Sequence, residues 1–162
     1  MAETLGSLVD KLSIKNLRIW HLDEALEDEG TPASKRQELQ AKRDLVDSQR
    51  QELAKEIDGF LGAALRGEVR IRDEKIKMYT NTNVSSSEAI KELGRAVSEL
   101  ASRNIKIWHL EDEVRRTDLP DATIVQTKRK IDTTNQERND LMDKVDEILL
   151  KHSTTTSRGS NE

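Results

Sequence analysis

The residues best suited to chemistry lie in a heptapeptide that this chain carries twice. NLRIWHL at residues 16–22 returns 88 positions later as NIKIWHL at residues 104–110. The two copies hold both tryptophans and two of the three histidines of the chain. Indole rings can stack on bases or sugars, and imidazole can bind metals or move protons. The duplication therefore predicts either a duplicated site or the duplicated core of a helical fold.

A metal site is the most specific catalytic hypothesis for these copies. His21 and Glu24 stand at i and i+3, and His109 and Asp112 repeat the spacing. One histidine and one acid from each copy could meet and hold a divalent ion that activates water. The spacing is weakly specific, because the acids belong to runs that resemble solvated helix faces. No glycine-rich phosphate loop or nucleophile elbow accompanies it. A divalent-metal-dependent hydrolase is therefore the third of three hypotheses. The sequence leaves open whether the protein is an enzyme but favours a non-enzyme, and we expect no cofactor.

Binding of an anionic ligand is the first hypothesis. The duplicated helices carry cations, amide donors and stacking rings in matched positions, a set that suits a nucleotide or sugar nucleotide captured without conversion. The predicted ligand-binding residues are Lys15, Asn16, Trp20, His21, Arg50, Arg103, Asn104, Trp108, His109 and Arg138.

Each of these residue types also has a purely structural interpretation, and both interpretations stay open at this stage. An asparagine in a helical seam can fix register, a tryptophan can fill volume, and an arginine can belong to a buried ion pair. The second hypothesis is accordingly a structural or protein–protein interaction module.

The repeat extends well beyond the heptapeptide. Matches without a gap define a unit at about residues 4–61 and a second unit at about residues 88–150, joined by a crossover at residues 62–87. Apolar residues recur in each unit with three- and four-residue steps, which predicts helix, turn, helix. Two hairpins joined by a long crossover predict an all-α four-helix bundle, one domain spanning residues 1–152. The low-complexity tail 153–162 is predicted to be disordered.

Capping and helix-breaking residues predict where the elements begin and end. Gly30 is expected to stop the first helix, Thr31 to cap the next and Pro32 to occupy its first turn. In the crossover, alternating Val69 and Ile71 predict an extended segment or short strand. Ser85 and Glu88 have the spacing of a capping box, which places the next helix start there.

A helical wheel divides the repeated heptapeptide by face. Asn16 falls within the apolar stripe, Trp20 lies at its edge and His21 lies on the far side; the second copy repeats this division. A shared site must therefore be assembled between copies or between chains. Within the first hairpin, counting antiparallel positions places Asp23 near Glu38.

Composition limits the remaining function classes. Charged residues make up 36% of the chain and hydrophobic residues 34%, so the core must be a narrow seam, which favours a homodimer or other homo-oligomer. The net charge of −4 is made of interspersed signs, which argues against general nucleic-acid binding. Without cysteine there is no disulfide or thiolate site. No apolar run approaches membrane-spanning length, so we expect a soluble cytoplasmic protein with no membrane contact.

The repeated segments carry a family resemblance. KLSIKNLRIWHLDEAL and ASRNIKIWHLEDEVRR, followed by KRKIDTTNQERNDLMDKVDEIL, resemble a bacterial and phage-associated family of short helical proteins catalogued as a domain of unknown function. That family is built around N-x-x-[IL]-W-H-L-[ED]-[DE]. The likeness spans most of residues 5–28 and 93–150. It implies a helical fold and no particular activity; His21, Asp23, Glu24 and their second-copy counterparts match the motif.

Overall fold

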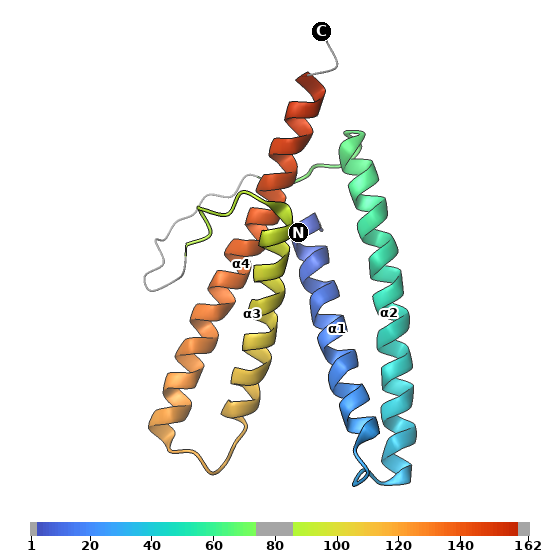
Figure 1. The fold of residues 1–162 in the computed structure, drawn as a ribbon, viewed down its shortest axis with the longest axis vertical. Helices are drawn as coiled ribbons and strands as arrows, with labels where there is room; N and C mark the ends of the chain where they lie inside the picture. Colours follow the sequence, from blue (N-terminus) through green and yellow to red (C-terminus); the bar gives the residue numbers. More distant parts are fainter. Residues whose placement is uncertain (1–2, 74–85, 159–162) are drawn as a thin grey trace.

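A computed structural model describes residues 3–73 and 86–158 of the chain. The helices of this part are α1 (Leu5–Glu27), α2 (Ala33–Leu65), α3 (Leu93–Val114) and α4 (Asp121–Arg158). α1 and α2 form one antiparallel hairpin, and α3 and α4 form the other (Figure 1). The prediction of an all-α fold built from two hairpins is confirmed.

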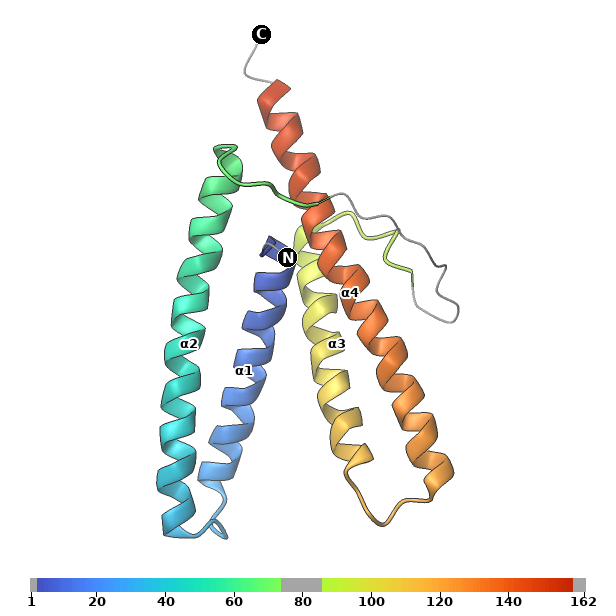
Figure 2. The same ribbon diagram turned by 180° about the vertical axis from the view of Figure 1, so that it is seen from behind.

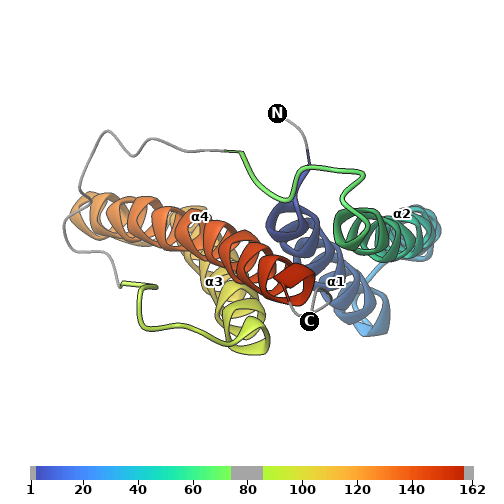
Figure 3. The ribbon, with the colours of Figure 1, turned by 90° about the horizontal axis from the view of Figure 1, so that it is seen from above.

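The two hairpins meet along one edge only. α1 packs against both α3 and α4, whereas α2 packs along α1 and not along α3. α1 and α3 begin close together, and the hairpins diverge toward their turns (Figure 1, Figure 2). The view from above places α2 on the far side of α1 from α3 and α4 (Figure 3). The bundle is therefore open between α2 and α3.

The hydrophobic core lies where the start of α1 meets α3 and α4. Ala96, Leu100 and Val145 are completely buried, and Leu5 and Leu149 pack against them. Burial of apolar surface is the main force that holds one hairpin against the other.

A glycine fixes the approach of α1 to α4. A Cβ atom on Gly6 would lie 2.2 Å from the carbonyl oxygen of Met142, so only glycine permits this backbone contact. The Gly6 amide also donates a buried hydrogen bond of 2.7 Å to Oδ1 of Asp146. The bond satisfies a first-turn amide that has no partner within its own helix.

The turn of the first hairpin differs from the prediction: α1 ends before Gly30, and the N-cap of α2 lies one position after Thr31. α1 ends at Glu27, and Pro32, not Thr31, occupies the N-cap of α2 without a side-chain cap bond. The Thr31 hydroxyl donates back to the Ala25 carbonyl. The guanidinium of Arg36 donates to carbonyls at the end of α1, so unpaired carbonyls there find partners across the turn.

The crossover between the hairpins contains no strand in its described residues, contrary to one of the two forms predicted for it. α2 continues to Leu65, and the chain turns at Gly67, which has a φ of 74°. The helix start predicted at the Ser85–Glu88 capping box is wrong, because Glu88 lies outside a helix and α3 begins at Leu93. Ile71 and Ile90 are buried in the core, so the non-helical segments on either side of the crossover contribute to core packing. Ser85, the other half of the predicted capping box, lies outside the described residues.

α4 is longer than the sequence predicts. It continues to Arg158, into the tail predicted to be disordered from residue 153. The Ser153 and Thr154 hydroxyls donate to the Leu150 carbonyl one turn back, so they follow the helix. Residues 159–162 lie outside the described part.

Candidate functional site

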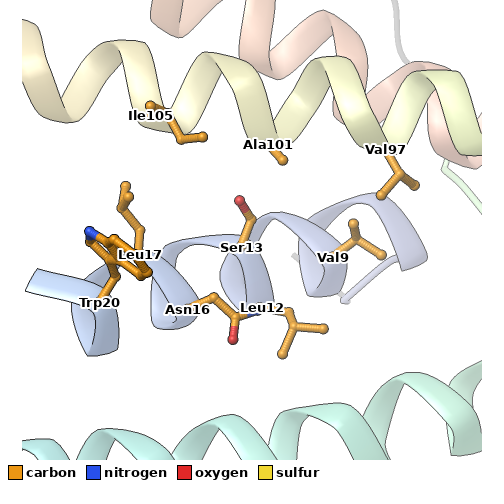
Figure 4. A pocket seen from close by; sticks show the side chains of 9 residues that line it. All are labelled: Val9, Leu12, Ser13, Asn16, Leu17, Trp20, Val97, Ala101 and Ile105. Carbon is orange, nitrogen blue, oxygen red and sulfur yellow. The ribbon is translucent and has the colours of Figure 1, made fainter. Parts of the chain in front are cut away.

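An apolar groove runs between α1 and α3, on the side where the bundle is open. Its volume is about 400 Å³. It is lined by Val9, Leu12, Ser13, Asn16, Leu17, Trp20, Val97, Ala101 and Ile105 (Figure 4).

The two walls of the groove are the same positions of the repeat. Val9, Ser13 and Leu17 of α1 face the row Val97, Ala101 and Ile105 of α3 (Figure 4). Each α3 residue stands 88 positions after its α1 counterpart, the offset of the repeat. The groove therefore follows the pseudo-two-fold axis that relates the repeats. Steps of four keep each row on one helix face.

The rim of the groove exposes a large aromatic ring. Trp20 is 65% exposed, and Ile105 on the opposite wall is 48% exposed. Leu12 and Asn16 lie on the side of α1 that is turned toward α2 (Figure 4). An exposed apolar patch of this kind is typical of an interaction surface.

The two repeated asparagines have different environments, which corrects the prediction that both lie in the seam. Asn104 is buried, and its Nδ2 donates a hydrogen bond of 2.8 Å to Oδ1 of the buried Asp10. Arg138 Nε lies 3.9 Å from the same oxygen. Asn16 is exposed at the edge of the groove: it lies on the side of α1 that is turned toward α2, and α2 does not pack along α3 to close that side.

His21 contacts the other repeat, as a site assembled between copies requires. Its ring stacks on Trp108, with ring centroids 4.3 Å apart and an interplanar angle of 6°. Its Nδ1 lies 2.9 Å from Oε2 of Glu24. The predicted metal site is not formed in the described part of the chain, which contains no group of three histidines or acids able to hold an ion. His21 meets an indole where that site needs a second imidazole or acid.

Most of the predicted cations already have partners. Arg103 binds Glu137 at 2.7 Å and Glu99 at 2.9 Å, whereas Lys15, its repeat counterpart, donates to Gln49. These pairs occupy the same repeat positions, since Gln49 corresponds to Glu137.

Arg50 is held on its own helix. Its guanidinium contacts Asp47 through two nitrogens, and this hydrogen bonding lowers the pKa of the Asp47 carboxyl. Asp23 accepts a hydrogen bond of 3.0 Å from Nε of Arg43, on the neighbouring helix α2. The predicted ligand-binding residues thus do not converge on one anion site.

Comparison with known protein families identifies one that matches most of the chain. The family described as "Protein of unknown function (DUF4254)" matches residues 1–72 and 94–162. The chain belongs to this family. The two matched segments contain the two hairpins of this DUF4254 protein. No curated protein and no solved structure matches the chain.

A cationic hollow on the second hairpin is a feature that the sequence-based prediction missed. Lys106 of α3 and Arg129, Lys130 and Thr133 of α4 line it, together with Thr134, around about 190 Å³. The three cations have no ion-pair partner in the described part of the chain. The run TKRK at residues 127–130 was the available signal, but only the fold places Lys106 beside it.

The described helices of this DUF4254 protein include none that is both long and apolar enough to cross a membrane.

Proposed function

We propose that this protein is a non-enzymatic helical binding module that receives the apolar face of an amphipathic helix in the groove between its hairpins. The open groove with matching apolar walls carries the proposal. Its rows follow four-residue steps, the spacing by which one helix presents ridges to another. An exposed tryptophan at the rim is the residue type that most often dominates an interface.

The shape and polarity of the groove favour a helix over a small polar ligand. Seven of its nine lining residues are apolar, and only Ser13 and Asn16 offer polar side chains. Such a surface gains binding energy mainly from apolar area removed from water.

A titration with a model amphipathic helix of leucine and lysine tests this function. In a Trp108→Phe background, Trp20 is the only indole, so its emission reports directly on the groove. We expect a saturable blue shift, which Ile105→Glu abolishes because it places a charge on the groove wall. Val125→Glu is the matched control: Val125 is 49% exposed on α4 and lies outside the groove. A peptide that shifts nothing, or an equal loss in both variants, contradicts the proposal.

Capture of an anionic, nucleotide-like ligand is a second candidate, supported by the cationic hollow rather than by the residues first predicted. Three cations converge there with no carboxylate in the lining, while the hydroxyls of Thr133 and Thr134 donate to carbonyls of their own helix. A phosphate group is the ligand chemistry that this combination suits. The hollow is small, so it would hold the phosphates while the rest of the ligand lies outside.

Calorimetry with inorganic pyrophosphate and with ATP tests this second candidate. Lys106→Ala combined with Lys130→Ala should abolish binding. Lys35→Ala combined with Lys55→Ala removes the same charge from exposed sites on α2 and should leave binding intact. Equal heats for both pairs of variants would show that only net charge matters.

The WHL motif as a family signature, and a bacterial or phage origin, remain proposals from the resemblance.

A further inference from the structure

The two repeats contact each other through residues on one side of the pseudo-two-fold axis. The equivalent residues on the other side do not contact each other. On the side that makes the contact, Gly6 lies against the Met142 backbone and donates to Asp146. The repeat counterparts of the donor and acceptor are Gly94 and Asp58. No atom lies within 4 Å of a Cβ built on Gly94, and Asp58 is exposed with no hydrogen bond or ion pair in the described part of the chain.

The aromatic pair shows the same asymmetry. His21 stacks on Trp108 across the repeats. The counterpart pair is His109 and Trp20, and both of these residues are exposed. The sequence therefore supplies a second stacking pair that the single chain leaves apart.

Two further positions complete the pattern. Leu5 is 5% exposed in the core, whereas its counterpart Leu93 is 38% exposed. Asn104 is buried, whereas Asn16 lies open beside the groove. The open side of the molecule therefore carries a second set of the residues that hold the hairpins together.

We propose that a second copy of this chain occupies the open side, with α2 of each copy packed against α3 of the other. This inference rests on the proposed function, because it names the helix that the groove receives. Asp58 of one copy then accepts from the amide of Gly94 in its partner, as Asp146 does from Gly6 within the chain. The arrangement is isologous: each copy offers α2 and receives one on α3, so the assembly closes as a dimer.

The fold favours a second copy over the chain's own α2. α1 lies between α2 and α3 (Figure 3) and is held by the Gly6 backbone contact and the buried bond from Asn104. Ile71 and Ile90, which flank the crossover, are buried in the same core. The first hairpin is thus fixed in a position that keeps its own α2 away from α3, while the surface on α3 stays accessible to another molecule.

Sedimentation equilibrium of the full chain over a wide range of micromolar concentrations tests the inference. We expect the mass to rise from 18.4 kDa to twice that value. Gly94→Leu should raise the dimer Kd by at least about tenfold, because the side chain blocks the backbone approach. Ala122→Leu is the control, since Ala122 is exposed on α4, outside the proposed contact between α2 and α3. Asp58→Ala should weaken the dimer as well, and circular dichroism verifies that each variant is folded.

Trp20 emission in the Trp108→Phe background locates the interface. We expect a blue shift that tracks dimer formation and disappears in Gly94→Leu. A chain that stays monomeric at all concentrations, or a dimer that Gly94→Leu and Asp58→Ala leave unchanged, overturns the inference. Trp20 emission that is blue-shifted in the monomer also overturns it, because the chain's own α2 would then have closed the groove.

The two proposals fail in different ways. If the model peptide binds the groove of a chain that stays monomeric, the second copy is wrong and the helix-binding function stands. If the chain dimerises through Gly94 but the peptide does not bind, the dimer stands and a general helix-binding function is wrong.

Discussion

Asn104 and Asp10 join the two repeats through a single buried hydrogen bond of 2.8 Å. Asn104 is 4% exposed and Asp10 is 7% exposed, and they are 94 residues apart in the chain. A buried carboxylate needs such donors to offset its loss of hydration. The bond therefore both orients the hairpins and makes the core sensitive to the loss of either partner.

Asn104→Ala should lower the free energy of unfolding by about 1–3 kcal/mol, because Asp10 loses its amide donor while remaining buried. Urea denaturation followed by circular dichroism measures this change. Asn16→Ala is the matched control at the equivalent repeat position, and an exposed site should change stability by less than about 0.5 kcal/mol. Equal losses in both variants would contradict the asymmetric burial of the pair.

The glycines at equivalent repeat positions should respond in opposite directions to the same substitution. Gly6→Ala forces a Cβ against the Met142 carbonyl oxygen and should destabilise the fold by at least about 2 kcal/mol. Gly94→Ala meets no atom and should stabilise the monomer by about 0.5–1 kcal/mol through helix propensity. Thermal unfolding at low concentration compares them. A mild effect of Gly6→Ala would mean that α1 does not approach α4 this closely.

Glu147 should make stability depend on acid pH. Hydrogen bonds from Lys151 and Lys144 lower the pKa of its carboxyl from 4.5 to about 2. Its stabilising effect is therefore fully present above pH 4.5 and is lost as the pH falls toward 2, where the folded state also takes up the proton. Urea midpoints across this window should fall with pH, and less steeply in Glu147→Gln.

The control for Glu147 removes the same charge elsewhere. Glu52 is exposed on α2 and has no ion-pair partner in the described part of the chain. Glu52→Gln should keep the slope of the parent protein. A slope that is equal in the parent and in Glu147→Gln assigns the acid sensitivity to other carboxylates.

His21 and Trp108 should be energetically coupled. A double-mutant cycle with His21→Ala and Trp108→Ala, measured by urea denaturation, should give a coupling of about 0.5–1.5 kcal/mol for the stacked rings. The cycle for Trp20 and His109, the equivalent pair, should give a value near zero in the monomer. Coupling of equal size in both cycles would mean that the monomer closes symmetrically.

Much of the fold could be predicted from the sequence, because helices are encoded locally. Three- and four-residue steps of apolar residues identify the four helices, and the offset of 88 identifies the two hairpins. Local signals failed where a long-range contact decides the outcome. Ser85 and Glu88 have the spacing of a capping box, but α3 begins only at Leu93, after Ile90 has been buried in the core.

The candidate site could be predicted only in part. The sequence predicted that a shared site would be assembled between the copies or between chains; in the fold, His21 contacts Trp108 and the groove lies between α1 and α3. The predicted cations were assigned to a ligand because a sequence does not reveal which carboxylate an arginine will meet. Arg103 was a candidate clamp, and the fold pairs it with Glu137. The cationic hollow was not predicted, because Lys106 and Lys130 belong to different helices and only the fold brings them together.

The sequence by itself determined the elements of this protein and their duplication, because helix formation and amphipathic patterning depend on neighbours a few residues apart. Only the tertiary structure decided which of two equivalent residues is buried. Identical local patterns place Gly6 and Gly94, or Asn104 and Asn16, in the same position of a helix. Burial depends on which helix packs on the other side, and in this chain α4 packs against α1 whereas α2 does not pack along α3. The repeat is symmetric in sequence, and its packing is not.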